Sequence, residues 1–405
     1  MKKSNVFAAL SLITMFSTGA YALDLNNPLP NWVDKNREKA DGKPPAISAT
    51  RAVPPSGFHL PAEYEPAGAV VISWAAYTDM LTGIAKAVTG PGKAQLWAVA
   101  GPSSISGVPA SKYSRISAPI DSVWVRDYGP FGIEGNKPGI VDTIYRHYQY
   151  RRNDDAVPAV LAKAKNIGVY QMPLILDGGN LMVDSKGNLF TTKRTYIWNS
   201  DKSQEQVDSL LKSYFGAKKV ITFEYSGYPG EPADGTGHID MFMKLLDDNT
   251  VLLSVADTEP FKSNTEKAMA WFKANKAPNG QPYKIITVKG WATDAWYTYT
   301  NSLVVNGVAI IPSYSNKPQE EAAAKAAYES AGYTVVPVNS DESIVSGGSI
   351  HCTTQVIPML PSGRALNSEE VFTQLPEYKV DMTAAPLGPL TGSETSTALN
   401  QLLGK

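Results

Sequence analysis

The chain has 405 residues, of which 43% are hydrophobic and 19% are charged, a composition typical of globular proteins with a large buried core. Its 37 basic and 38 acidic residues give a formal net charge of −1. This balance argues against a nucleic-acid-binding surface and against a polybasic membrane surface.

The first 22 residues predict a secretory signal peptide. Lys2 and Lys3 precede a largely apolar stretch, Val6 to Phe16, and Ala20-Tyr21-Ala22 offers small residues for signal peptidase. The apolar stretch is shorter than the roughly 20 residues that span a membrane. We expect cleavage after Ala22 and a periplasmic or secreted protein, without membrane contact once the signal is removed.

Polar segments rich in proline flank the expected compact domain. Residues 23–60 are rich in proline and show no sustained hydrophobic period, which predicts an N-terminal leader. The domain is expected over 61–360. Residues 361–405 are rich in Pro, Gly, Ser and Thr and predict a tail that packs on the domain or trails from it.

Helical and strand patterns alternate inside the domain, which indicates an α/β fold. Hairpins are predicted over 181–192, 241–254 and 303–311, the last because Asn306-Gly307 suits a type I′ turn. A further strand is predicted over 350–358. Helices are predicted over 155–167, 203–215, 264–275 and 318–331.

Polar residues recur along the chain at nearly even spacing, with separations of 50, 61, 63 and 51 residues between Asp127, Asp177, His238, Asn301 and Cys352. Such spacing is typical of repeated units that bring their polar ends to one axis. An ordinary α/β protein with loops of similar length fits the spacing as well.

Cys352 is the only cysteine, so no intrachain disulfide can form. Exported proteins usually carry cysteines in pairs, and a lone thiol is either a small buried side chain or a reactive group. Cys352 follows Gly347 and Gly348 and begins an apolar run. This arrangement favours a thiol at the end of a strand, facing a cleft.

His238 and Asp240 are predicted on one face of a strand, because side chains two residues apart on a strand point the same way. His238 is then the candidate acid and base for Cys352. His351 is disfavoured, since neighbours on a strand face opposite sides. The chain has 4 His, and none stands at a familiar metal-ligand spacing, which argues against a metal site.

Asp127 supplies a second carboxylate beside Asp240. A guanidinium is planar and donates a fork of hydrogen bonds, which carboxylates accept in pairs. Two buried carboxylates repel each other unless a cation lies between them. The pair therefore predicts a guanidinium-binding site, with a local ion pair between Arg126 and Asp127 as the alternative.

Six segments, in order, resemble the guanidino-group-modifying (pentein) enzymes, in particular agmatine deiminase and the Porphyromonas-type peptidylarginine deiminase. They cover most of the chain from about residue 61 to residue 358, and they are Pro61-Ala62-Glu63-Tyr64-Glu65-Pro66, Trp124-Val125-Arg126-Asp127-Tyr128-Gly129-Pro130, Leu176-Asp177-Gly178-Gly179-Asn180, Gly237-His238-Ile239-Asp240-Met241-Phe242, Tyr299-Thr300-Asn301-Ser302 and His351-Cys352-Thr353-Thr354-Gln355.

The resemblance implies an α/β propeller of five ββαβ-type units with pseudo-fivefold symmetry. It implies that Cys352 attacks the guanidinium carbon and that Asp127 and Asp240 bind its nitrogens. His238 would protonate the departing ammonia and then activate water against a covalent thiouronium. No metal or cofactor is implied. Further residues expected to bind substrate are Asn301, Asp177 and Trp124.

The substrate is the open point of the resemblance. In the peptidylarginine type, two arginines before an Asn-Asp-Asp segment bind the α-carboxylate of a C-terminal arginine. Arg151 matches one of these positions, Gln149 takes the other, and Arg152 is the expected substitute. Agmatine has no carboxylate, so this basic pair favours deimination of peptidyl or free arginine to citrulline. Agmatine deiminases usually carry Glu at the position of Asp177.

The first alternative is an agmatine deiminase that yields N-carbamoylputrescine, because the segments around Cys352 and Asp127 are more similar to those enzymes. Amidino transfer to an amine and non-catalytic guanidinium binding are further alternatives. The expected partner is a small or peptidic guanidino substrate, with no nucleic acid, and an oligomer is left open.

Overall fold

The computed structural model of the chain describes residues 23–40, 52–228 and 231–359. The expected signal peptide (1–22) and tail (361–405) lie outside these residues, so both stay predictions. Helices and strands alternate along the described chain, which confirms the α/β class. None of the described helices combines the length and the apolar character needed to cross a membrane.

Four segments repeat one order of elements. Each has two antiparallel strands, a helix, and a third strand that pairs in parallel with the second. The segments are β4 (Phe131–Ile133), β5 (Gly139–Ile144), α3 (Arg152–Lys165) and β6 (Gly168–Ile175); β7 (Leu181–Val183), β8 (Asn188–Thr192), α5 (Gln204–Phe215) and β9 (Lys219–Phe223); β12 (Met243–Asp247), β13 (Thr250–Val255), α6 (Phe261–Ala274) and β14 (Lys284–Lys289); and β17 (Leu303–Val305), β18 (Val308–Ser313), α7 (Pro318–Glu329) and β19 (Thr334–Asn339).

The fifth sheet joins the two ends of the described domain. Its first strand along the sheet is β20 (Gln355–Pro358), which pairs antiparallel with β1 (Ala67–Ser73). Helix α1 (Thr78–Thr89) leads to β2 (Gln95–Val99), which runs parallel to β1, and β3 (Tyr113–Ile116) extends the sheet. The last strand of the domain thus completes the unit that the first strand begins.

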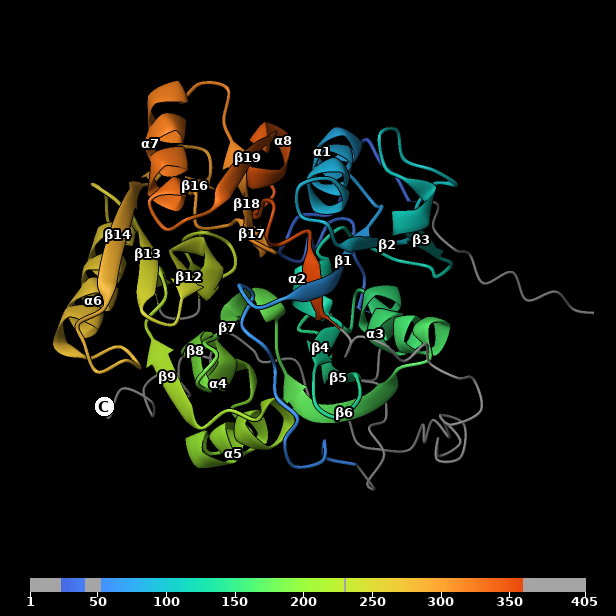
Figure 1. Ribbon diagram of the computed structural model, residues 1–405, viewed down its shortest axis with the longest axis horizontal. Helices are drawn as coiled ribbons and strands as arrows, with labels where there is room; N and C mark the ends of the chain where they lie inside the picture. Colours follow the sequence, from blue (N-terminus) through green and yellow to red (C-terminus); the bar gives the residue numbers. More distant parts are fainter. Residues whose placement is uncertain (1–22, 41–51, 229–230, 360–405) are drawn as a thin grey trace, which may run out of the picture.

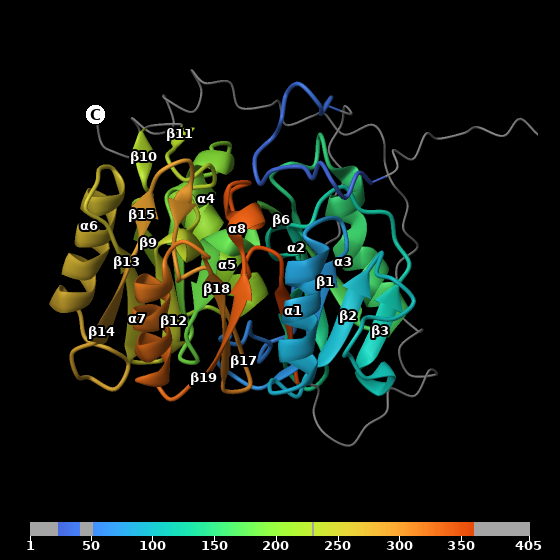
Figure 2. The ribbon, with the colours of Figure 1, turned by 90° about the horizontal axis from the view of Figure 1, so that it is seen from above.

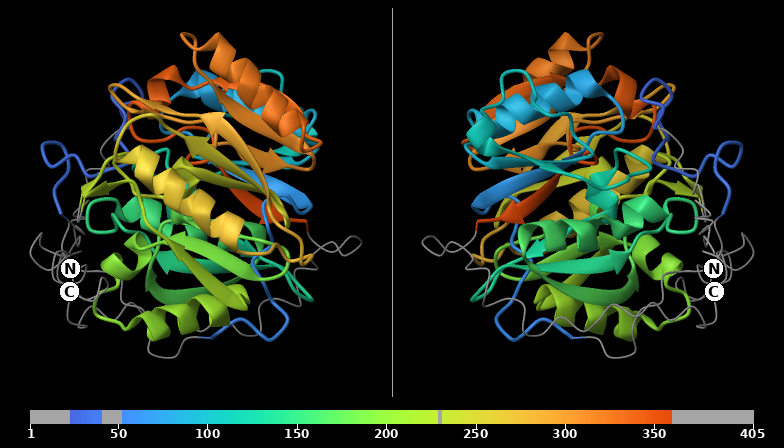
Figure 3. Two further views of the ribbon diagram at one scale, coloured as in Figure 1. Left: turned by 90° about the vertical axis from the view of Figure 1, so that its left-hand side faces the viewer. Right: turned by 90° about the vertical axis from the view of Figure 1, so that its right-hand side faces the viewer.

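Helices α1, α3, α5, α6 and α7 lie at the periphery of the molecule and the strands lie inside (Figure 1). Side views show α6 and α7, in yellow and orange, on the outer side of their strands (Figure 3). The sheets are separate, and no closed sheet is formed among the described residues. The rotation that would relate the five units about one axis therefore stays a prediction.

Local sequence signals explain several boundaries. Ser203 precedes α5 and forms a capping box with Gln206, and Gly216 ends the helix in the left-handed conformation. Asn306 and Gly307 have φ angles of 47° and 81°, which the type I′ turn between β17 and β18 requires. These elements agree with the predicted ones within a few residues.

Three elements differ from the expectation. The strand predicted over 350–358 begins only at β20, because residues 350–353 form a turn. The strand predicted from Met241 begins at β12, after a short 3₁₀ helix, η3 (Ile239–Met241). No helix is predicted at α1, which contains Gly83. A Cβ there would lie 2.9 Å from the Val338 side chain, so the glycine serves close packing against β19.

Residues 23–40 of the expected leader contain turns and no helix or strand. They run along one end of the molecule, shown in blue at the upper side of Figure 2. The shorter elements of the described chain are α2 (Val125–Tyr128), α4 (Arg194–Trp198), α8 (Asp341–Ile344), η1 (Ala110–Lys112), η2 (Gly178–Asn180), β10 (Gly227–Tyr228), β11 (Glu231–Pro232), β15 (Trp291–Ala292) and β16 (Trp296–Tyr297).

Candidate active site

Segments far apart in the sequence bring their polar residues together beside the sheets. They are α2, η2, the residues around η3, the residues before β17 and the turn before β20. The side chains they contribute are 0% exposed: Asp127, Asp177, His238, Asp240, Asn301 and Cys352. Buried polar groups of this density are costly unless they are paired or serve a ligand.

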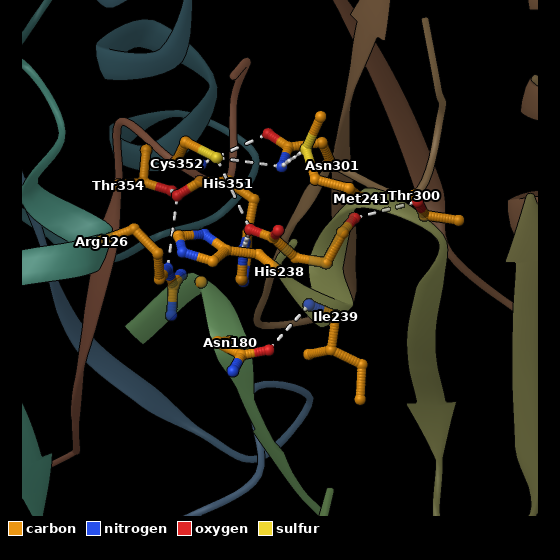
Figure 4. A network of polar contacts seen from close by, with 12 residues as sticks. Arg126, Asn180, His238, Ile239, Met241, Thr300, Asn301, His351, Cys352 and Thr354 are labelled. Carbon is orange, nitrogen blue, oxygen red and sulfur yellow. Dashed lines mark hydrogen bonds and ion pairs between the residues drawn. The ribbon is translucent and has the colours of Figure 1, made fainter. Parts of the chain in front are cut away.

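Cys352 is held by Asn301, and Figure 4 shows the dashed contacts between these two residues. The Cys352 Sγ lies 3.1 Å from Asn301 Nδ2 and 3.6 Å from Asp240 Oδ2. Asn301 Oδ1 accepts hydrogen bonds from the backbone N–H groups of Ser349 at 3.0 Å and Cys352 at 3.3 Å. Asn301 therefore fixes both the sulfur and the turn that carries it.

Trp124 packs against the same turn. A Cβ on Gly348 would lie 2.7 Å from Trp124 Cζ3 and 2.7 Å from the Cys352 Cβ, so only glycine fits between them. The Trp124 Nε1 donates to the carbonyl of Leu29 at 2.9 Å. Trp124 thus lies beside the turn that carries the thiol. Its expected contact with substrate stays a prediction.

His238 lies between two carboxylates. Its Nε2 is 3.1 Å from Asp177 Oδ2, and its Nδ1 is 3.5 Å from Asp127 Oδ1. Burial acts to lower the pKa of His238, but Asp127 and Asp177 outweigh it, so the pKa is raised. The expectation that His238 and Asp240 share a strand face is wrong, because His238 precedes η3. Both residues nevertheless reach the same site.

Three buried atoms of the site have no hydrogen-bond partner among the described residues: Asp127 Oδ2, Asp240 Oδ1 and His238 Nδ1. A Cβ on Gly179 would lie 2.6 Å from His238 Nδ1, 2.7 Å from Asp127 Oδ1 and 3.1 Å from Asp240 Oδ2. The glycine leaves open the space that these groups surround. Two carboxylates and an imidazole around such a space match the hydrogen-bonding needs of a guanidinium.

The carboxylates differ in their charge environment. Burial raises the pKa of Asp127 to about 6, and Asp177 and Asp240 add to the rise against the opposing effect of His238. Asp177 lies 2.9 Å from Arg146 Nε. Although burial opposes it, this arginine holds the pKa of Asp177 below its ordinary value. Asp177 therefore orients His238 while Arg146 offsets its charge.

His351 takes part in the site, which corrects the sequence-based argument against it. It lies in a turn and not on a strand, and its Nδ1 is 2.7 Å from Asp240 Oδ2. Its Nε2 is 2.7 Å from Glu63 Oε2, and Glu63 also pairs with Lys244 and with Arg126. Although burial opposes it, these contacts with Lys244, His351 and Arg126 hold the pKa of Glu63 well below its ordinary value.

His351, Glu63, Lys244 and Arg126 thus form a buried network behind Asp240. The sequence signals for it are the resembling segments 61–66 and 351–355, which contain Glu63 and His351. No sequence signal marks Arg146 or Lys244 as members of the site.

Arg151, which the sequence predicts to bind a substrate carboxylate, is already paired in this structure. Arg151 is 0% exposed and pairs with Glu38, with Nε to Oε1 at 2.7 Å and Nη2 to Oε2 at 3.0 Å. Its Nη2 also donates to the carbonyls of Pro30 and Trp32 at 2.8 Å each. Arg152 is exposed at the start of α3. In this structure Arg151 binds the N-terminal segment, because Glu38 already supplies the carboxylate.

A cation would find ligand atoms in the same place. Asp127, Asp177 and His238 each offer one such atom, all within 4.8 Å of one another. Arg146 already carries a positive charge to Asp177, which competes with a metal ion. The expectation that neither metal nor cofactor takes part stays a prediction.

The chain is similar in sequence to known deiminases. The model of the Porphyromonas-type peptidyl-arginine deiminase family matches residues 59–358. An agmatine deiminase of Medicago truncatula is 25% identical over 368 residues, which cover 75% of this chain and 97% of that protein.

Solved structures show the same fold. The agmatine deiminase of Enterococcus faecalis has a TM-score of 0.64 at 20% identity, covering 76% of this chain and 99% of that one. A substrate-bound agmatine deiminase of C. jejuni has a TM-score of 0.62 at 17% identity, covering 78% and 99%. The resemblance read from the sequence is confirmed: the chain belongs to the Porphyromonas-type peptidyl-arginine deiminase family and is a hydrolase that acts on carbon–nitrogen bonds.

Proposed function

We propose that the protein hydrolyses the guanidinium group of a small free guanidine, with agmatine as the first candidate, through a covalent intermediate on Cys352. The observation that carries the proposal is the set of unpartnered atoms of Asp127, Asp240 and His238 beside the Cys352 sulfur. A bound guanidinium would supply five N–H donors to this set.

The reaction would run in two steps. The Cys352 sulfur forms a bond to the guanidinium carbon, and one carbon–nitrogen bond breaks while His238 donates a proton to the departing ammonia. Water then attacks the thiouronium carbon and gives a proton to His238. The carbon–sulfur bond breaks, the proton of the added hydroxyl group passes to solvent, and the ureido product leaves with the sulfur again a thiolate. The rise in the His238 pKa supports its role as the proton donor.

Agmatine comes before peptidyl arginine for two reasons. The curated relative from Medicago truncatula, which is 25% identical to this chain, is named an agmatine deiminase. In addition, Arg151, the residue expected to bind the α-carboxylate of arginine, is occupied by Glu38. Hydrolysis of agmatine would give N-carbamoylputrescine and ammonia.

Free arginine is the second candidate, because of one buried cation. Arg194 is 8% exposed, and its Nε has no hydrogen-bond partner among the described residues. Its Cζ lies 5.3 Å from the centre of the Trp198 ring, which is 6.0 Å from the His238 ring. Burial lowers the pKa of Arg194 to about 10, and Arg146 adds to the effect. A substrate carboxylate near Arg194 would accept a hydrogen bond from its Nε and would offset the cost of burying its charge.

The test compares ureido product from the purified protein with agmatine, free arginine and a peptide ending in arginine. We expect turnover of agmatine and a loss on the order of a thousandfold or more in Cys352→Ala. That variant should still bind the guanidine, because Asp127 and Asp240 are intact. Wild-type protein that forms no product from any of the three would contradict the proposal, as would turnover by Cys352→Ala within about tenfold of the wild-type rate.

A further inference from the structure

Residues 23–40, called the strap below, are fastened across the candidate active site. Their backbone carbonyls accept hydrogen bonds from Trp124 Nε1 at Leu29, from Arg151 at Pro30 and Trp32, and from Arg146 at Asn31. The backbone N–H of Asn31 donates to the carbonyl of Ser346 at 2.7 Å. The strap thus contacts the segments that carry Asp127 and Cys352, and it also contacts Arg146, the ion-pair partner of Asp177.

The strap also fits the surface beneath it. The Trp32 ring packs on two glycines, since a Cβ on Gly235 or on Gly347 would lie 2.9 Å from it. Glu38 anchors the other part of the strap through its buried pair with Arg151. The family match covers residues 59–358, so the strap itself lies outside the matched residues.

One side chain of the strap has unmet hydrogen-bonding needs. Asn31 is 0% exposed, and both its Oδ1 and Nδ2 lack partners among the described residues. Buried amides in native proteins are almost always paired, because an unpaired polar group loses its bonds to water. The backbone of Asn31 contacts Ser346 and Arg146. The Asn31 Cβ would lie 3.3 Å from a Cβ on Gly347. Gly347 stands two residues before Ser349, which belongs to the turn that carries Cys352.

We propose that the strap closes the site over a free guanidine and that Asn31 is a specificity-determining residue that binds the end of the substrate opposite its guanidinium. This inference rests on the proposed deiminase function. In the structure with the strap in contact, the side chains of Asp127, His238, Asp240 and Cys352 are 0% exposed. We expect a polypeptide attached to the guanidine to need the strap displaced. The strap therefore restricts the enzyme to small guanidines and excludes peptides ending in arginine.

The test uses the mature full chain and three variants: Asn31→Ala, Glu38→Gln and the control Lys35→Ala, an exposed residue of the same strap. KM and kcat are measured for the small guanidine that is turned over and for a peptide ending in arginine. Asn31→Ala should raise KM for the small guanidine about tenfold, as expected for the loss of one hydrogen bond to a ligand, with a smaller effect on kcat.

Glu38→Gln should loosen the strap and raise kcat/KM for the peptide relative to the small guanidine. Lys35→Ala should match the wild type in both substrates. The proposal is overturned if Asn31→Ala leaves KM unchanged, or if the wild type hydrolyses the peptide as well as the small guanidine.

A second measurement separates this proposal from the proposed function. Trypsin cleavage after Lys35 and Arg37 is followed in Cys352→Ala, with and without agmatine or arginine. Binding of either guanidine should slow cleavage in the strap at least severalfold. The strap proposal is overturned if calorimetry shows that a guanidine binds but trypsin cleavage of the strap is not slowed. Absence of turnover in the wild type overturns the proposed function instead, and the trypsin result then decides on the strap alone.

Discussion

The Cys352 thiol is surrounded by groups that oppose its ionisation. Burial raises its pKa well above the ordinary value, and the carboxylates of Asp240 and Asp127 raise it further. The hydrogen bond from Asn301 Nδ2 acts in the opposite direction but is outweighed. A guanidinium cation between the two carboxylates would favour the thiolate, so the substrate itself would help to prepare its nucleophile.

The free protein should therefore react slowly with an alkylating agent. We expect the rate of Cys352 alkylation by iodoacetamide to rise with pH without reaching a plateau below pH 9, because the thiol stays protonated. Cys352 is the only cysteine, so the mass of the intact protein reports the reaction. Asp240→Asn should increase the alkylation rate at pH 8 while it decreases turnover. A plateau below pH 9 in the wild type would contradict this account.

At the scale of one element, η2 shapes the site through its backbone. The N–H of Gly179 donates to Asp127 Oδ1 at 3.0 Å, and its missing side chain leaves room between Asp127, Asp240 and His238. Gly179→Ala should lower kcat/KM at least a hundredfold, because the added methyl occupies the guanidinium space. Overpacking should cost about 1–3 kcal/mol of stability.

Gly168→Ala is the matched control, since a Cβ there meets nothing within 4 Å. Steady-state kinetics and thermal unfolding of both variants separate blocked binding from lost folding. Near-wild-type kcat/KM in Gly179→Ala would show that this space does not receive the substrate.

Elements whose signals are local could be predicted from the sequence. Ser203 and Gly216 delimit α5, and Asn306-Gly307 delimits a hairpin, because the determining contacts lie within a few residues. The 3₁₀ helix η3, which stands where a strand is predicted at His238, has no such local signal. It is stabilised by contacts to distant segments: the backbone N–H of Ile239, for example, donates to Asn180 Oδ1. A period-2 argument cannot detect a 3₁₀ turn set by tertiary contacts.

At the scale of the whole molecule, the sequence indicates the candidate catalytic residues but not the residues that support them. Cys352, His238, Asp240 and Asp127 stand in segments with a recognisable pattern. The partner of Arg151 is Glu38, 113 residues away in a segment without any hydrophobic period. Proximity of such pairs depends on how the units pack, and a single sequence carries no record of it.

Buried carboxyls with raised pKa values predict how the stability of the whole molecule depends on pH. Burial raises the pKa of Asp155 to about 7, against a hydrogen bond from the Tyr145 N–H. Burial and then Asp121 raise the pKa of Asp154 to about 8. An acid with a raised folded pKa contributes stability that is complete below its unfolded pKa and is lost as pH rises through the folded value.

The free energy of unfolding should therefore fall between pH 6.5 and pH 8, by about 1.4 kcal/mol per pH unit for each group still protonated in the folded state. The melting temperature should fall with it. Below about pH 6.5 His147 acts in the opposite direction, because burial and Arg146 hold its pKa well below its ordinary value. Calorimetry across this window checks the slope, and Asp154→Asn should flatten it whatever its effect on absolute stability. A melting temperature that is constant or rising from pH 6.5 to pH 8 would mean that these carboxyls are already ionised in the folded protein, and that solvent or a bound cation reaches them.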